Sequence, residues 1–181
     1  MKTDIIVTQW LNSFAGQSGI LDSLMIILTS YGVVLLVALI AMRWWSKRDR
    51  PTVRYMAICC GMATACGLFL NQIILIFLHR IRPYDAGVTK LLIDKSHDPS
   101  FPSDHATVVF AIAFSLLLQR DRYTGFFLAS GVLIGLSRIY VGTHYVSDIL
   151  GGALTATAAT YLVARLYKQE SPLNRLLVRI L

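Results

Sequence analysis

The sequence is poor in charged residues, and this shortage excludes an ordinary soluble domain. Only 15% of its 181 residues are Asp, Glu, Lys or Arg, against about 25% in a typical soluble protein. Hydrophobic residues make up 55% of the chain and gather in runs of about 18 residues or more, a length that crosses the hydrocarbon core of a bilayer. We therefore predict an integral membrane protein.

Cysteine is also scarce. The three cysteines, Cys59, Cys60 and Cys66, all fall within one apolar run. Their spacing matches neither a disulfide framework nor a zinc site. We interpret them as small apolar packing residues, and we expect no metal and no other cofactor.

Acidic residues are fewer than basic ones, 10 against 17, which gives a net charge of +7. A basic chain can indicate a nucleic-acid partner. Here, however, most Lys and Arg residues flank apolar runs, where they set membrane topology and contact lipid headgroups. We therefore expect the bilayer, and no nucleic acid, as a partner. Because internal repeats and low-complexity segments are also absent, we predict a single domain over residues 1–181.

The apolar runs predict an all-α integral membrane helical bundle with five transmembrane spans. The predicted spans cover about residues 21–42, 53–78, 103–118, 123–141 and 146–167. Before them, residues 3–16 place Ile5, Trp10 and Phe14 on roughly one helical stripe. This pattern is typical of an amphipathic helix lying in the membrane interface.

The distribution of positive charge predicts how the spans are oriented. With the N-terminus outside, the blocks 43–54, 120–122 and 165–181 face the cytoplasm and hold 11 of the 17 Lys and Arg residues. Such an excess on the cytoplasmic side is the usual bias in membrane proteins. The polar segments 79–105 and 138–148 would then meet on the extracytoplasmic side.

The first of these segments ends with a helix start. Pro102, Ser103 and Asp104 form a strong N-terminal signal, and a helix N-terminus offers free N–H groups that bind phosphate. His105 would face this phosphate seat from the first turn. Taken alone, the same residues also fit a simple helix cap beside an interface histidine.

The second segment pairs a histidine with a carboxylate. His144 and Asp148 are four residues apart and share one face of a helix. The carboxylate can fix the tautomer of the imidazole and leave its other nitrogen as a nucleophile. Arg138, at the end of an apolar span, and Arg82, before Pro83, add planar donors for phosphoryl oxygens.

Together these residues resemble the type 2 phosphatidic acid phosphatase (PAP2) superfamily, whose site is similar to that of vanadium haloperoxidases. Its motifs are Lys-(six residues)-Arg-Pro, Pro-Ser-Gly-His, and Ser-Arg-(five)-His-(three)-Asp. The third is complete between Ser137 and Asp148, and the second occurs as Pro102–His105 with Asp in place of Gly. The first keeps Arg82-Pro83 but has Leu75 in place of Lys. The form Pro-Ser-Asp-His is similar to that of bacterial undecaprenyl diphosphate phosphatases of the bacitracin-resistance type.

The resemblance implies roles for individual residues. His144 attacks the terminal phosphorus, Asp148 holds its ring, and His105 protonates the leaving group and then activates water. The residues expected to bind phosphate are Arg82, Arg138, Ser103, Asp104, Arg80 and His79. Of these, Arg80 or His79 is expected to supply the cation that Leu75 lacks.

The expected function is therefore hydrolysis of undecaprenyl diphosphate to undecaprenyl phosphate through a phosphohistidine, at the extracytoplasmic face of a bacterial inner membrane. The expected partners are this polyprenyl lipid and the bilayer. One alternative is a phosphatase of phosphatidylglycerophosphate or phosphatidate. Others are an anion or lipid transporter, and a metal site built from Asp104, His105, His144 and Asp148.

Overall fold

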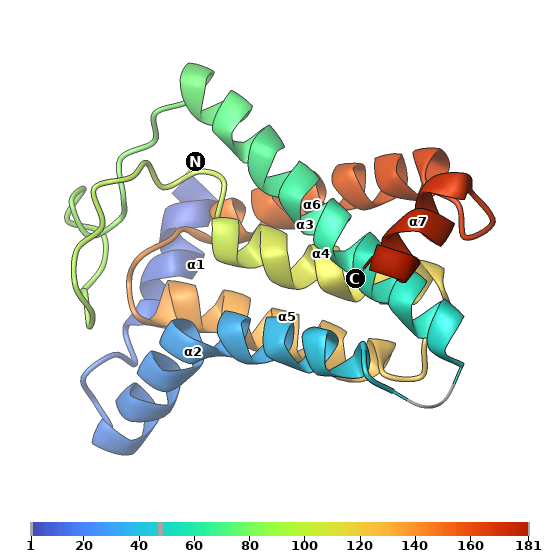
Figure 1. The fold of residues 1–181 in the computed structure, drawn as a ribbon. Coiled ribbons are helices and arrows are strands. Elements are labelled where there is room, and N and C mark those ends of the chain that lie inside the picture. The colour runs from blue at the N-terminus through green and yellow to red at the C-terminus, as the bar shows by residue number, and fades with distance from the viewer. Residues whose placement is uncertain (1, 47–48, 181) are drawn as a thin grey trace.

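The computed structural model describes residues 2–46 and 49–180, and all the regular secondary structure in these residues is helical (Figure 1). The helices are α1 (Lys2–Asn12), α2 (Gly19–Arg43), α3 (Arg50–Phe77), α4 (Asp104–Leu118), α5 (Thr124–Tyr140), α6 (Val146–Leu166) and α7 (Pro172–Ile180). The prediction of an all-α membrane bundle is confirmed. The sequence analysis did not predict α7.

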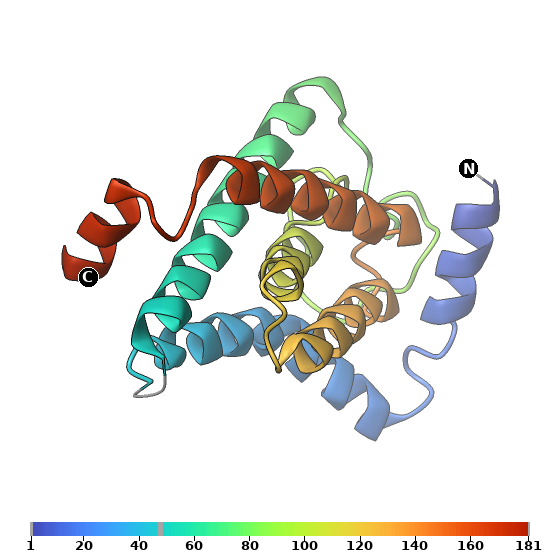
Figure 2. The same ribbon diagram turned by 90° about the vertical axis from the view of Figure 1, so that its right-hand side faces the viewer.

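The centre of the bundle is α4. It packs against α3, α5 and α6, and Figure 2 shows it seen almost end-on with α2, α3, α5 and α6 around it. Its small residues Ala106, Ala111 and Ala113 are fully buried. A helix that is apolar on all sides belongs in such an interior position.

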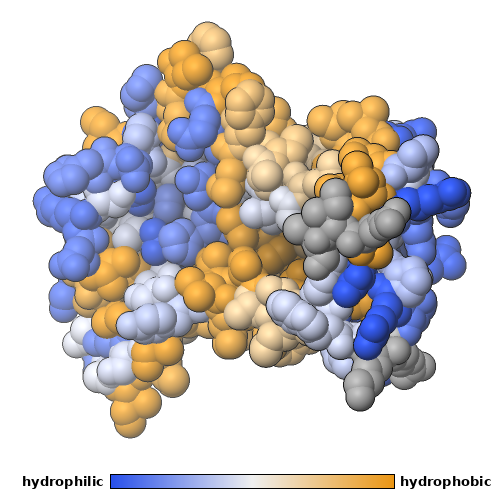
Figure 3. All heavy atoms as spheres, viewed as in Figure 1, coloured by the Kyte–Doolittle hydropathy of each residue, from blue (hydrophilic) through white to orange (hydrophobic). Residues whose placement is uncertain are grey.

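The outer surface of the bundle is apolar, as expected for a protein surrounded by lipid. Large hydrophobic side chains such as Val34, Phe69 and Leu154 are 65–71% exposed. Figure 3 shows hydrophobic side chains across the middle of the visible face and hydrophilic ones towards its ends. The protein is therefore a multi-pass membrane protein.

Three helices, α2, α3 and α6, are long and apolar enough to cross a membrane. The apolar helices α4 and α5 have 15 and 17 residues, or about 22–26 Å at 1.5 Å per residue, less than the 30 Å of a typical hydrocarbon core. The count of five spans therefore stays a prediction.

The helix α6 approaches the first turn of α4 closely. Gly152 allows this contact, because a Cβ atom there would lie 2.6 Å from the Ser103 carbonyl oxygen. The approach also lets the backbone N–H of Ser103 donate to the Asp148 carbonyl oxygen at 3.1 Å. The starts of α4 and α6 are thus held together, although about 40 residues separate them.

Candidate active site

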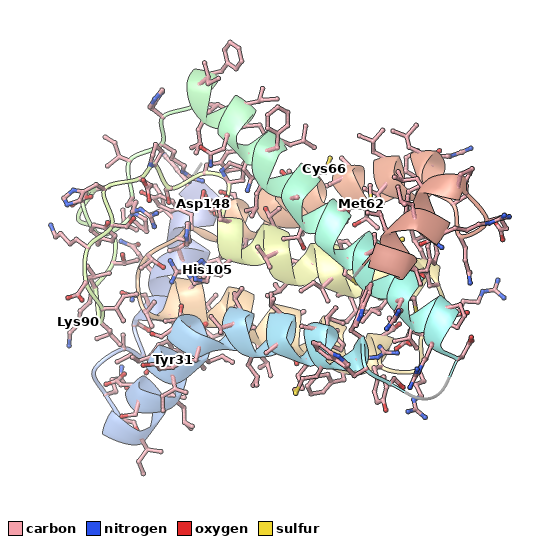
Figure 4. All side chains as sticks on the ribbon, viewed as in Figure 1. Tyr31, Met62, Cys66, Lys90, His105 and Asp148 are labelled. Carbon is pink, nitrogen blue, oxygen red and sulfur yellow. The ribbon has the colours of Figure 1, made fainter. Side chains whose placement is uncertain are left out.

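The two polar segments that the sequence analysis singled out meet at one end of the bundle. The last turns of α3, the start of α4, the end of α5, and the loops between α3 and α4 and between α5 and α6 surround a cavity of about 270 Å³. Its lining includes Arg82, Asp104, His105, Arg138 and His144. Figure 4 shows His105 and Asp148 near each other at this end, where α1 also lies.

His144 lies in the loop between α5 and α6 and is 3% exposed. Its Nδ1 atom is 2.8 Å from the Ser100 carbonyl oxygen. Because a carbonyl only accepts hydrogen bonds, Nδ1 carries the proton and Nε2 keeps a free electron pair. Nε2 lies 3.5 Å from Nη1 of Arg82, a residue of the cavity lining. The geometry therefore turns the nucleophilic nitrogen towards the cavity.

Burial and the neighbouring charges keep the His144 imidazole neutral. Burial has the largest effect and lowers the pKa of His144. Asp148 raises the pKa, whereas the cations of Arg138 and Arg82 lower it further. The pKa falls to about 4 as a result. At neutral pH the ring is therefore uncharged, as a nucleophile must be.

Asp148 is fully buried behind His144, and both of its oxygen atoms accept strong hydrogen bonds. Oδ2 accepts from the Ser100 hydroxyl at 2.5 Å and from the Tyr145 backbone N–H at 2.8 Å. Oδ1 accepts from Nη1 of Arg80 at 2.6 Å. The direct distance from Asp148 Oδ2 to His144 Nδ1 is longer, 3.5 Å.

Ser100 therefore links the carboxylate to the imidazole, with its hydroxyl bonded to Asp148 and its carbonyl to His144. The sequence motif predicts that Asp148 holds the ring and indicates no role for Ser100. Every residue carries a backbone carbonyl, so the residue type at position 100 could not indicate this role. The only signal in the sequence was the position of Ser100 two residues before Pro102.

Arg138 and Arg82 are nearly buried and lack a carboxylate partner among the described residues. Arg138 donates from Nη1 to the Thr29 hydroxyl at 3.0 Å, while its buried Nε atom has no acceptor in the described part of the chain. Arg82 donates to the carbonyl oxygens of Asp98 and Thr143 at 2.7 and 3.1 Å. Two buried cations without counter-charge make the cavity a site for an anion.

The start of α4 contributes a neutral cap and two titratable side chains. The buried Ser103 hydroxyl accepts from the Ala106 N–H at 3.5 Å, so it serves as the helix cap. Asp104 and His105 follow it and line the cavity. Asp104 accepts from Nδ2 of Asn71 at 2.7 Å, which fixes a negative charge at the cavity wall.

Besides Ser103, which does not line the cavity, two further predicted phosphate ligands lie outside it. Arg80 sits between the carboxylates of Asp4 and Asp148. His79 is exposed and lines an adjoining cavity of about 300 Å³ that shares Arg82. Leu75 itself lines the cavity of about 270 Å³. The replacement of the missing lysine by Arg80 or His79 stays a prediction.

The same geometry bears on the metal-site alternative. Within residues 2–46 and 49–180, no three His, Cys, Asp or Glu side chains are placed to hold a metal ion together. Both carboxylate oxygens of Asp148 already accept hydrogen bonds, from Arg80, Ser100 and Tyr145. The four residues proposed for that site therefore do not form a ligand set.

The fold is shared with solved membrane phosphatases. The chain superposes on a transmembrane PAP2-type phosphatidylglycerolphosphate phosphatase from Bacillus subtilis with a TM-score of 0.68, at 21% identity over 94% of this chain and 87% of that one. On LpxE from Aquifex aeolicus the TM-score is 0.70, at 22% identity over 88% of this chain and 93% of that one.

Sequence comparison identifies the family. Undecaprenyl-diphosphatase BcrC of Bacillus subtilis is 32% identical over 94% of this chain and 87% of the relative. An undecaprenyl-diphosphatase of Sulfolobus acidocaldarius is 26% identical over 88% of this chain and 77% of the relative. A family model described as the PAP2 superfamily matches residues 23–172. The chain therefore belongs to the PAP2 superfamily and is a membrane lipid phosphatase.

Proposed function

We propose that this phosphatase hydrolyses undecaprenyl diphosphate to undecaprenyl phosphate and inorganic phosphate through a phosphohistidine on His144. The observation that carries the proposal is the free Nε2 atom of His144 at the wall of a cavity that also holds two buried arginines without carboxylate partners. A nucleophile and two uncompensated cations at one anion-sized cavity are the requirements of phosphoryl transfer.

The reaction proceeds in two displacements. In the first, Nε2 of His144 forms a bond to the terminal phosphorus, and the bond from phosphorus to the bridging oxygen breaks. His105 gives a proton to the departing lipid monophosphate. The new positive charge on the His144 ring is stabilised by the Ser100 carbonyl and the Asp148 carboxylate, while Arg82 and Arg138 bind the charge on the phosphoryl oxygens.

In the second displacement His105 acts as the base. It takes a proton from a water molecule, whose oxygen attacks the phosphorus of the phosphohistidine. The N–P bond breaks, inorganic phosphate leaves, and His144 returns to its neutral form. One histidine thus serves as acid and then as base, as microscopic reversibility requires of a double displacement.

The choice of undecaprenyl diphosphate is supported by the relatives of that name and by an apolar surface beside the cavity. A cavity of about 510 Å³, almost wholly apolar, lies between α2 and α3 and is lined by α3 residues that include Gly61, Ala65 and Leu68. Helical spacing continues this face of α3 to Gln72 and Leu75, which line the catalytic cavity. We infer that the isoprenoid chain of the substrate lies along this face of α3.

The proposed site faces the extracytoplasmic side of a bacterial inner membrane. This orientation follows the charge bias, because the opposite end of the bundle carries the basic blocks 43–54, 120–122 and 165–181. Used carrier lipid released on the outer side would reach the site without crossing the bilayer first.

A substrate panel on the purified protein tests the proposal. We expect phosphate release from undecaprenyl diphosphate, loss of activity in His144→Ala, no effect of EDTA and inhibition by vanadate. Turnover of phosphatidylglycerophosphate at a higher kcat/KM would reassign the substrate. An absence of phosphate release from every lipid would favour the transporter alternative instead.

The covalent step has its own test. With substrate labelled in the terminal phosphate, His105→Ala should accumulate a protein-bound label that is stable in base and lost in acid, as expected of an N–P bond. His144→Ala/His105→Ala provides the matched control and should bind no label. Labelling of that double variant would overturn the assignment of His144.

A further inference from the structure

The helix α1 faces the bundle with its polar side. Asp4, Thr8 and Asn12 follow one another at intervals of four residues and so share one face. Thr8 and Asn12 are 0% and 5% exposed, whereas Ile6 and Trp10 on the outer side are 63% and 61% exposed. Apolar side chains turned outward suit a helix beside lipid, and the polar stripe is then free to bind the protein.

At one end, this stripe binds the first turn of α6. Asp4 accepts from the backbone N–H of Ser147 at 3.0 Å and from its hydroxyl at 2.6 Å, and the Thr8 hydroxyl accepts from the Val146 N–H at 3.2 Å. The first N–H groups of a helix have no partner inside it. The helix α1 therefore supplies caps to α6 from outside, close to Asp148.

At its other end, the stripe binds the end of α5. Nδ2 of Asn12 donates to the carbonyl oxygen of Tyr140 at 2.8 Å and to that of Lys90 at 2.9 Å. Residues 140–147, which carry His144, are thus held by α1 on both sides.

Arg80 joins α1 directly to the catalytic carboxylate. Its Nη2 donates to Asp4 and its Nη1 to Asp148, each at 2.6 Å, and its guanidinium lies 3.8 Å from the centre of the Tyr145 ring. Burial lowers the pKa of Arg80, but Asp4 and Asp148 outweigh it and raise the pKa. One cation therefore neutralises two carboxylates that would otherwise repel each other.

We propose that Arg80 and Asp4 are positioning residues, which dock α1 on the active site and hold the Asp148 carboxylate in place behind His144. The inference rests on the proposed function and goes beyond it, since neither residue touches the catalytic cavity. The charged and titratable groups around Asp148 are Arg80 and Asp4 on one side and the neutral His144 on the other, with Arg82 and Arg138 beyond His144.

The double variant separates this electrostatic role from a structural one. Arg80→Gln leaves the carboxylates of Asp4 and Asp148 facing each other without a cation, so they repel each other and Asp148 moves from its place behind His144. We expect kcat to fall about tenfold with KM little changed. Adding Asp4→Asn removes the repulsion, so Asp4→Asn/Arg80→Gln should recover part of the lost kcat. Arg80→Lys should recover part of it as well.

Arg43→Gln is the matched control. It breaks another arginine–aspartate pair, Arg43 with Asp121, whose atoms lie 2.6 Å apart at the opposite end of α4. We expect a fall in Tm without a change in kcat. If Arg80→Gln shows the same pattern as this control, or if the double variant is less active than Arg80→Gln, the inference is overturned.

Hydrogen exchange decides the inference independently of turnover. In the full-length protein, Arg80→Gln and Asp4→Asn should each speed amide exchange in residues 140–148, whereas Arg43→Gln should not. If the wild-type protein released no phosphate, the proposed function would fail, and unchanged exchange in this segment would separately overturn the positioning role.

Discussion

The Nδ1 atom of His144 lies closer to the carbonyl oxygen of Ser100, at 2.8 Å, than to the carboxylate of Asp148, at 3.5 Å. The main chain thus fixes the tautomer of the nucleophile, and the carboxylate acts from behind both residues. This arrangement divides the task of orienting His144 between two groups, which substitutions can separate.

Ser100→Ala should be milder than Asp148→Asn. The alanine keeps the carbonyl that accepts from His144 and loses only the hydroxyl that donates to Asp148 at 2.5 Å. Loss of this buried bond to a charged group should lower the free energy of unfolding by about 1–3 kcal/mol and kcat by about tenfold, a cost of roughly 1.4 kcal/mol in the barrier. Asp148→Asn changes the partners of Arg80, Ser100 and Tyr145 together, so its loss of kcat should be larger. Steady-state kinetics and urea unfolding of the two variants check the order; a greater loss in Ser100→Ala would contradict it.

The depressed pKa of His144 predicts how stability depends on pH. The ring titrates near pH 6.5 in an unfolded chain and near 4 when folded. The contribution of the neutral His144 ring to the free energy of unfolding is complete above pH 6.5. It is lost as the pH falls towards 4, because the unfolded state then binds a proton that the folded state does not. Tm measured between pH 4 and 7.5 should therefore fall more steeply in the wild type than in His144→Gln. Parallel curves would show that His144 does not titrate differently on folding.

Arg138 should weaken the fold while it serves catalysis. It is 8% exposed, without a carboxylate partner among the described residues and with a buried Nε atom that has no acceptor there. Arg138→Met removes a costly buried charge, so we expect a higher Tm in the absence of anions and a loss of kcat/KM by about 10²–10³, as for other donors to transition-state charge. Vanadate should raise the Tm of the wild type more than that of the variant. A lower Tm for Arg138→Met without anions would show that the guanidinium stabilises the resting protein.

The gathering of four site residues at one cavity was predictable from the sequence because each stands in a short motif near the end of an apolar helix. Arg82, His105, Arg138 and His144 line one cavity because the helix ends and loops that carry them lie on the same side of the bundle. Their residue types are those that phosphoryl transfer needs, and the order of the motifs matches the family.

The groups that orient these residues were not predictable in the same way. Asp4 and Asp148 are joined through Arg80 across more than 140 residues of sequence, and no local pattern reports such a contact. The side of α1 that contacts the protein was not predictable for a related reason. Next to lipid, the apolar face of a helix can point outward. Periodicity therefore identifies the polar and apolar faces but does not show which one contacts the protein. Arg80 was expected at the phosphate because its charge fits there equally well.

Asp104 provides the last prediction, on how tightly the site holds phosphate. Its carboxylate lines the cavity and is held by Asn71 at 2.7 Å, so it repels any anion bound to Arg82 and Arg138. Since Asp104 is exposed, the repulsion should be modest, and Asp104→Asn should lower the Ki of inorganic phosphate about two- to fivefold. Asp85→Asn, an exposed carboxylate outside this cavity and paired with Lys95, is the control and should leave the Ki unchanged. Weaker inhibition in Asp104→Asn would mean that Asp104 donates a hydrogen bond to the phosphate in its protonated form.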